Sequence, residues 1–173
     1  GAVGVFDGSQ GVEPQSETVW RQAENYKVPR VVFVNKMDRI GADFYGTVNQ
    51  IEEVLEAETV CLNIPIGDEE KFGGVIDLLE MKAIIFDESS LGAEYEYVEI
   101  PTGYLVRAEE EREKLLEKLS LFNDDLLEKI LEGETISSEE IKSTIRKSCI
   151  ENRLIPVFAG SAIKNKGVQP LLD

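Results

Sequence analysis

Three short apolar runs near the two ends of the chain predict buried β-strands. They are Ala2–Phe6, Val31–Val34 and Leu154–Ala159. Continuous apolar runs of this length are typical of strands that are covered on both faces. Pro156 lies inside the third run, and proline has no N–H to donate to a central ladder. We therefore expect that strand to lie at the edge of its sheet.

Between these runs, apolar residues recur at the spacing of an α-helix. A first helix is predicted to begin near Pro14. It contains Val19, Ala23 and Tyr26, apolar residues at helical spacing. A second helix is predicted over 44–57, and Gly167–Leu172 has the pattern of the opening of a third. Strands that alternate with helices indicate a mostly parallel sheet, so the predicted fold class is α/β.

The middle of the chain has a different pattern, in which short strands are separated by glycine-rich turns. The predicted strands are Val60–Ile66, Val75–Asp77, Met81–Phe86 and Tyr95–Ile100. A helix follows over 107–121, with Ala108, Leu115, Leu116 and Leu119 facing inward. The next is predicted over 125–131, before Gly133. A last helix follows Ser137, where Glu140 completes the spacing of a capping box.

Charge is concentrated in this middle part. Residues 65–150 hold 22 of the 34 acidic side chains and 10 of the 18 basic ones. The pattern and the charge together predict an acidic α+β insertion over 64–151. The flanking segments 1–63 and 152–173 would then form one α/β domain.

Net charge and composition exclude several functions. The net charge of −16 should repel nucleic-acid backbones, so no direct nucleic-acid binding is expected. The chain has no histidine, which excludes Ser/His/Asp or Cys/His catalysis and histidine-based metal sites within it. No apolar run approaches the roughly 20 residues of a membrane helix. The two cysteines lack metal-binding or redox spacing, and we expect free thiols.

Asn35, Lys36 and Asp38 form an N-K-x-D tetrapeptide directly after the second strand. Ligands of doubly wound sheets bind at the carboxyl ends of strands, where this tetrapeptide lies. Guanine offers two adjacent donors, its ring N–H and its exocyclic amine, and the Asp38 carboxylate can accept from both. Asn35 is expected to tie neighbouring loops together and to reach the base edge. The aliphatic part of Lys36 can cover the base face.

Gly160, Ser161 and Ala162 follow the third strand at the equivalent end of the sheet. Small residues let the backbone approach a base closely, and the Ala162 amide could donate to the guanine carbonyl oxygen. Two turns at neighbouring strand ends can close on one flat ligand. The sequence therefore predicts a guanine site at these turns.

Longer stretches give a more specific resemblance. The segment VEPQSETVWRQAENYKVPRVVFVNKMDRIGADF and the terminal GSAIKNKGVQPLLD resemble the elongation factor G family of translational GTPases. So do Pro65–Gly67, Phe72–Asp77, Met81–Ala83 and the LEGE run at Leu131–Glu134. The resemblance covers essentially the whole chain. It implies the later half of a doubly wound P-loop GTPase sheet interrupted by a small insertion, with 1–63 as the base-binding part.

The resemblance also implies roles for particular residues. Asn35, Lys36, Asp38, Ser161 and Ala162 would recognise the base of GTP or GDP in a cytoplasmic factor that drives GTP-dependent translocation on the ribosome. The acidic helix is associated in this family with the ribosomal stalk protein. The candidate contacts are Glu109, Glu110, Glu113 and Glu117.

Several parts of the family's site do not occur in these 173 residues. There is no GxxxxGK[ST] phosphate loop, no switch threonine for Mg²⁺ and no D-x-x-G with the water-orienting histidine of the family. GTP hydrolysis depends on phosphate positioning, so we expect no catalytic residues and no hydrolysis here, and weak nucleotide binding. Magnesium is expected only in a complete domain. We read the chain as a fragment that opens inside a structural element. Its Ala2–Phe6 edge is expected to be covered by a rearranged segment or by a second copy.

Two other hypotheses remain open. The chain could belong to a related GTPase that acts in ribosome recycling, tetracycline protection or termination. Alternatively, it could act in isolation only as an acidic protein-binding module whose guanine turns bind nothing.

Overall fold

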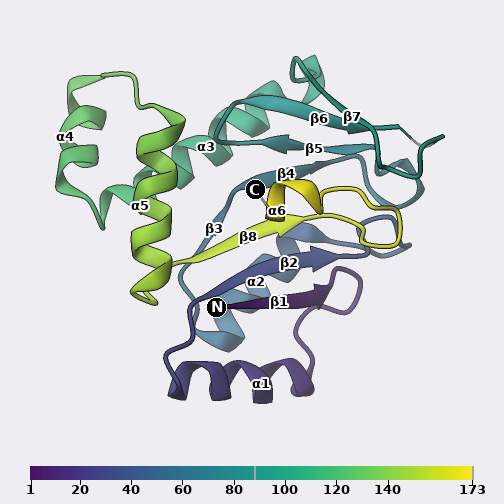
Figure 1. The fold of residues 1–173 in the computed structure, drawn as a ribbon, viewed down its shortest axis with the longest axis horizontal. Coiled ribbons are helices and arrows are strands. Elements are labelled where there is room, and N and C mark those ends of the chain that lie inside the picture. Colours follow the sequence, from purple (N-terminus) through teal and green to yellow (C-terminus); the bar gives the residue numbers. More distant parts are fainter. Residues whose placement is uncertain (88, 173) are drawn as a thin grey trace.

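The computed structural model describes residues 1–87 and 89–172, which form two four-stranded sheets (Figure 1). The first sheet is parallel, in the order β1-β2-β8-β3. Its strands are β1 (Ala2–Asp7), β2 (Arg30–Asn35), β8 (Ile155–Ala159) and β3 (Thr59–Cys61). In Figure 1 the arrows of β1, β2 and β8 all point to the right, so their carboxyl ends share one edge.

Helices cover both faces of this parallel sheet. Val32 and Val34 of β2 belong to a core shared with α1 (Pro14–Asn25) and α2 (Phe44–Leu55). Phe33, which points the opposite way, packs in a second core with α5 (Ser138–Ile150). Side chains of a strand alternate between its faces, so two cores on one strand require a covered sheet. The predicted α/β fold class is confirmed.

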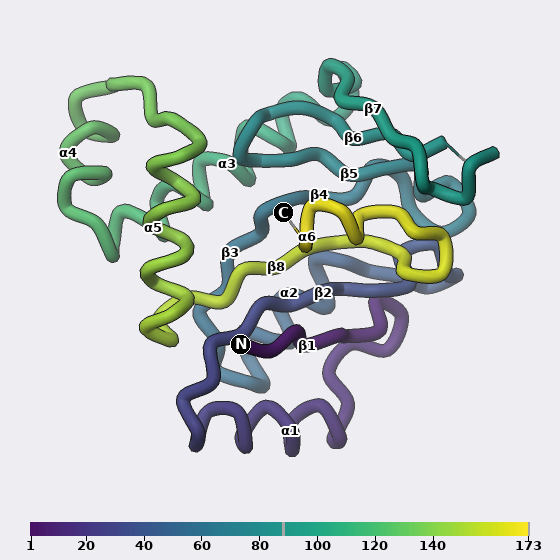
Figure 2. Tube along the Cα trace, viewed as in Figure 1, coloured from purple at the N-terminus to yellow at the C-terminus, as the bar shows by residue number. Residues whose placement is uncertain are grey.

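The second sheet is antiparallel and is built from consecutive strands. They are β4 (Asn63–Ile66), β5 (Gly74–Asp77), β6 (Lys82–Phe86) and β7 (Tyr95–Val98). Short 3₁₀ turns lie at η1 (Glu69–Lys71) and η2 (Thr102–Tyr104). The helices that follow are α3 (Leu105–Ser120) and α4 (Asp124–Glu132), and α5 returns the chain to β8 (Figure 2).

Local signals in this region were reliable. Ser137 and Glu140 form the predicted capping box at the start of α5. Gly133 ends α4 in the left-handed conformation, which glycine adopts without steric cost. The division of the chain at 63 and 151 stays a prediction. Among the described residues, no helix is long and apolar enough to cross a membrane.

The predicted strand over 60–66 is wrong as a single element. It is two strands, β3 and β4, which belong to different sheets and meet at Leu62. The Leu62 N–H still donates to Val157 O of β8, while Leu62 O accepts from Leu78 beside β5. One residue further on, the Asn63 side chain accepts from Ala159 N at 2.7 Å. A side chain thus extends the ladder where the backbone has left the sheet.

The expectation for Pro156 is also wrong, because β8 lies inside the sheet between β2 and β3. The N–H of Gly160 in the turn after β8 donates to Val34 O of β2. Hydrogen bonds between these parallel strands recur every second residue, so the N–H of a non-proline residue at position 156 would donate to Arg30 O. The thiol of Cys149 donates to this oxygen instead, at 3.3 Å. Because α5 supplies the missing donor, proline is tolerated in a central strand.

The first strand and first helix differ from expectation in burial. β1 forms the edge of the parallel sheet, and Val3 and Val5 are 51% and 59% exposed. In α1 the buried residue is Trp20, whose ring packs edge-on against Phe6. Val19 and Tyr26, two of the apolar residues at helical spacing, are exposed. The apolar spacing of α1 therefore did not identify its buried residue, Trp20.

Candidate functional site

The two sequence-predicted turns lie side by side at the carboxyl edge of the parallel sheet. Asn35 is the last residue of β2, and Gly160 follows the last residue of β8. The two strands are neighbours, with Val34 paired to Ala159. A parallel pair in this register brings the turns that follow the two strands to the same edge of the sheet, as the sequence predicted.

Two hydrogen bonds join the turns directly. The backbone N–H of Ala162 donates to Oδ1 of Asn35 at 2.8 Å. The N–H of Met37 donates to Gly160 O at 3.1 Å. Asn35 therefore fixes the second turn through its side chain, while Met37, which is buried, fixes it through the backbone. The Ala162 amide, expected to meet a base oxygen, donates within the protein here.

Lys36 is held by an aspartate that sequence reasoning missed. Its Nζ donates to Oδ2 of Asp7 at 2.6 Å, and its backbone has a left-handed φ of 64°. Asp7 ends β1 directly opposite Asn35, and Arg39 lies 3.7 Å from the same carboxylate. The sequence signal that could have identified Asp7 is a carboxylate at the end of a neighbouring parallel strand, because the carboxyl ends of such strands lie at one edge of the sheet.

The environment of Asp7 keeps it ionised. Burial alone would raise the pKa of Asp7, but hydrogen bonds from Lys36 and Ser9 outweigh it and lower the pKa from 3.8 to about 2. Ser9 contributes both its backbone N–H, at 2.9 Å, and its hydroxyl, at 2.7 Å. The cation and the loop donors thus favour the charged form, and this carboxylate fixes the Lys36 side chain.

Asp38 differs from its neighbours in the turn. Its side chain is only partly buried, and none of the described residues forms a hydrogen bond or ion pair with it. A carboxylate with two free acceptor oxygens can receive two parallel donors from one ligand edge. Of the residues predicted to recognise a base, Asp38 is the one whose polar atoms are uncommitted.

Ser161 is fully buried and shapes the second turn. Its backbone N–H donates to Lys166 O at 2.8 Å, and the N–H of Lys166 donates back to Ser161 O at 3.0 Å. Its Oγ accepts from Lys164 N at 3.4 Å. Ser161 therefore closes the loop between Ala162 and Asn165, which leaves Ala162 exposed beside Asn35.

Comparison with known proteins identifies the family. A family model described as the elongation factor Tu GTP binding domain matches residues 1–173. The chain belongs to this family. It is 56% identical over all 173 residues to elongation factor G of Ehrlichia chaffeensis and 55% identical to that of Ehrlichia canis. It spans about a quarter of the length of each relative, 25% in both cases.

A solved structure agrees with this assignment. A crystal structure of a protein from Thermus thermophilus superposes with a TM-score of 0.83 and 29% sequence identity. The match covers 96% of this chain and 24% of that one. The resemblance drawn from the sequence motifs is confirmed at the level of the family, and the similarity to elongation factor G extends over the whole GTP-binding-domain segment.

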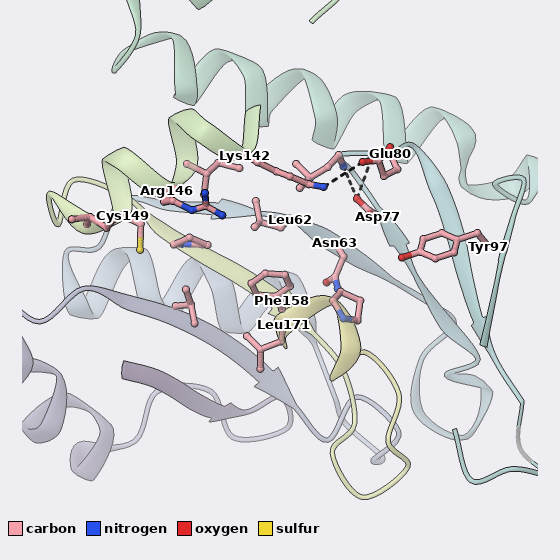
Figure 3. Close-up of a pocket in the computed structure, with 16 residues that line it drawn as sticks. Leu62, Asn63, Asp77, Glu80, Tyr97, Lys142, Arg146, Cys149, Phe158 and Leu171 are labelled. Atoms are coloured by element: carbon pink, nitrogen blue, oxygen red, sulfur yellow. Dashed lines mark hydrogen bonds and ion pairs between the residues drawn. The ribbon is translucent and has the colours of Figure 1, made fainter. Parts of the chain in front are cut away.

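An apolar cavity of about 600 Å³ lies elsewhere in this GTP-binding domain (Figure 3). Leu62, Phe158 and Leu171 line it, together with Arg146 and Tyr97, which lie at opposite ends of it in Figure 3. None of the predicted base-recognition residues is among its lining residues. Pro170 and Leu171, close to the last described residue, form part of its wall. The predicted base-recognition turns and this cavity therefore lie in different parts of the structure.

The lowered pKa of Asp7 predicts a pH-dependent contribution to stability. Because folding favours the ionised form, the stabilisation is complete well above pH 3.8 and is lost as the pH falls through about 2. The unfolding free energies of the chain and of its Asp7→Asn variant should differ by on the order of 1–2 kcal/mol at pH 7. Urea unfolding at pH 3 should show roughly half of that difference. A difference that is independent of pH would contradict the role of the Asp7 charge.

Proposed function

We propose that this chain forms the base-recognition part of the guanine-nucleotide site of a translation elongation factor. The full-length factor would drive GTP-dependent translocation on the ribosome. The observation that supports the proposal most directly is the bond from Ala162 N to Asn35 Oδ1, because it joins two turns from neighbouring strands beside the uncommitted Asp38. The relatives named elongation factor G support the choice of factor.

Each turn has a distinct role in this proposal. Asp38 accepts from the ring N–H and the exocyclic amine of guanine, which adenine cannot offer together. The stem of Lys36, anchored through Asp7, covers one face of the base. Asn35 and Ser161 hold the turns in place, and the Ala162 amide contacts the base oxygen after exchanging its bond to Asn35.

Hydrolysis is assigned to the longer protein rather than to these 173 residues. Phosphoryl transfer needs donors and a cation around the phosphates, and this sequence contains no GxxxxGK[ST] loop. Among the described residues, no group of three or more metal-ligating side chains is placed to hold an ion. For the longer factor we propose Mg²⁺ binding, GTP turnover, ribosome binding and a cytoplasmic location.

A nucleotide titration followed by amide NMR tests the base site. GDP is expected to shift the amide signals of 35–38 and 160–163, with weak affinity because the phosphates find few partners here. ADP should shift these signals far less, since its base cannot pair with Asp38. Equal shifts with both nucleotides, or shifts confined to other elements, would show that the turns do not recognise guanine.

A second proposal concerns the acidic face of α3. Glu109, Glu110, Glu113 and Glu117 are all exposed along one helix, and we propose that they bind the ribosomal stalk protein. This contact would persist without nucleotide if the chain acted alone as a protein-binding module. A row of like charges attracts a partner of opposite charge and fixes the orientation in which it docks.

Charge reversal on α3 tests the stalk contact. The double variant Glu109→Lys, Glu113→Lys should weaken binding of a stalk-protein domain by on the order of tenfold, and the loss should shrink at high salt. The matched control is Glu128→Lys, Glu132→Lys, two exposed residues at the same spacing on α4. If both variants lost the same affinity for the stalk-protein domain, the effect would come from net charge and not from a contact at α3.

A third proposal concerns the open edge of β1. Val3 and Val5 are exposed there, next to a groove of about 360 Å³ shared with α1, and no described strand pairs with the outer side of β1. We propose that this edge pairs with a strand of a second copy when the 173 residues are alone. Sedimentation should show concentration-dependent dimers, and a monomer at high concentration would rule this out.

A further inference from the structure

The tip of the β4–β5 hairpin contacts both turns of the candidate site. This hairpin tip, residues 67–73, connects Ile66 of β4 to Gly74 of β5 and carries η1. It belongs to the antiparallel sheet, whereas the turns belong to the parallel sheet. Contacts from one rigid loop to two separate turns can fix the spacing between them.

Glu69 holds the first turn at two points. Its backbone N–H donates to Met37 O at 3.1 Å. Its Oε1 accepts from the N–H of Gly41 at 2.8 Å. These two contacts lie on either side of Asp38 in the sequence. Glu69 itself has a left-handed φ of 52°, a conformation that non-glycine residues rarely adopt.

Lys166 holds the second turn. Its side chain is 3% exposed, and its Nζ donates to Phe72 O of the hairpin tip at 3.0 Å. Its backbone is doubly hydrogen-bonded to Ser161, as described above. A buried ammonium group needs hydrogen-bond acceptors, and the hairpin tip supplies one of them. This bond connects the loop that carries Ala162 to the antiparallel sheet.

The hairpin tip is itself rigid. The N–H of Gly67 donates to the Tyr104 hydroxyl at 2.8 Å, and Gly73 N donates to Ile66 O at 3.0 Å. Gly67 has a φ of 75°, and a Cβ there would lie 2.2 Å from Lys71 O, so only glycine fits this tight turn. The tip can therefore act as a fixed support.

We infer that Glu69 and Lys166 are positioning residues of the guanine site, through which the antiparallel sheet sets the separation of its two turns. This inference rests on the proposed base-recognition function. Neither side chain needs to touch the nucleotide. A turn that is already ordered loses less conformational freedom on binding, so the two contacts raise affinity by preorganisation.

Amide hydrogen exchange tests the inference without nucleotide. In Glu69→Ala the protection of the Met37 and Ala162 amides, which donate across the two turns, should fall by on the order of tenfold. Glu69→Gln keeps an acceptor oxygen and should retain the protection. The matched control is Glu70→Ala, an exposed residue of the same 3₁₀ turn. Unchanged protection in Glu69→Ala would overturn the inference.

A GDP titration of the same variants gives the second readout. Glu69→Ala should bind GDP roughly three- to tenfold more weakly than the chain, while Glu70→Ala and Glu69→Gln should match it. Lys166→Met should also weaken GDP binding and lower the protection of Ala162. Equal GDP affinity in Glu69→Ala and Glu70→Ala would overturn the positioning role. If neither the unaltered chain nor any variant binds GDP, the proposed base site is wrong. The exchange experiment would still show whether the hairpin tip orders the two turns.

Discussion

Replacing Asp38 by asparagine is expected to reverse the base preference of the site from guanine to xanthine nucleotides. The carboxylate accepts from two donors of guanine, whereas an amide presents one acceptor and one donating NH₂ group. Xanthine has a carbonyl oxygen where guanine has its amine, so it pairs with the amide. Losing a charge-assisted bonded pair costs about 1.5–3 kcal/mol, which predicts GDP binding roughly 10- to 150-fold weaker.

Competition titrations of GDP and xanthosine diphosphate against the chain and its variant measure this change. The control is Asp125→Asn, which removes one exposed carboxylate on α4. It should leave the ratio of the two affinities unchanged. If Asp38→Asn also leaves the ratio unchanged, Asp38 does not read the base, and the assignment of the turn would have to be given up.

The main parts of this site could be predicted from the sequence because they depend on local rules. A short apolar run followed by a polar turn marks the carboxyl end of a strand, and parallel strands bring such ends together. Asn35 and Ala162, 127 residues apart, were therefore expected at one edge, and they are hydrogen-bonded there. The fold class followed from the same alternation of strands and helices.

The supporting residues could not be predicted in this way. Asp7, Glu69 and Lys166 act through contacts between elements that are distant in sequence, and each has a common alternative reading as a surface charge. A charged residue in a turn is usually solvated, so sequence alone gives no reason to single one out. Their roles become visible only when the register of β1 with β2 and the place of the β4–β5 hairpin are known.

The misjudged strands have the same cause. Pro156 argued for an edge because a strand interior normally needs every N–H, and the sequence did not show that Cys149 of α5 would supply the donor. The run over 60–66 is apolar except for Asn63, and one polar residue does not mark Leu62 as the point where the chain changes sheets. Tertiary contacts decided both outcomes over local preference.

Gly160→Ala is expected to destabilise the chain and to separate the two turns. A Cβ on Gly160 would lie 2.5 Å from Cζ of Phe33 and 2.6 Å from the backbone oxygen of Lys166. The Phe33 ring lies in the core and the Lys166 oxygen belongs to the turn itself, so neither can withdraw without moving its surroundings. Forced contacts of this kind cost about 1–3 kcal/mol.

The strain should appear in both stability and binding. Thermal unfolding of Gly160→Ala should occur several degrees lower, since about 1 kcal/mol shifts Tm by roughly 2–4 °C in a domain of this size. The backbone movement should also displace the second turn from the first, which would weaken GDP binding. The same movement should break the bond from Ala162 N to Asn35 Oδ1 in the free chain and expose the Ala162 amide to exchange. Gly103→Ala is the matched control, because a Cβ there has no atom within 4 Å. If the two variants unfolded at the same temperature, the close approach at Gly160 would not be what fixes the second turn, and the glycine would have to be explained by something other than packing.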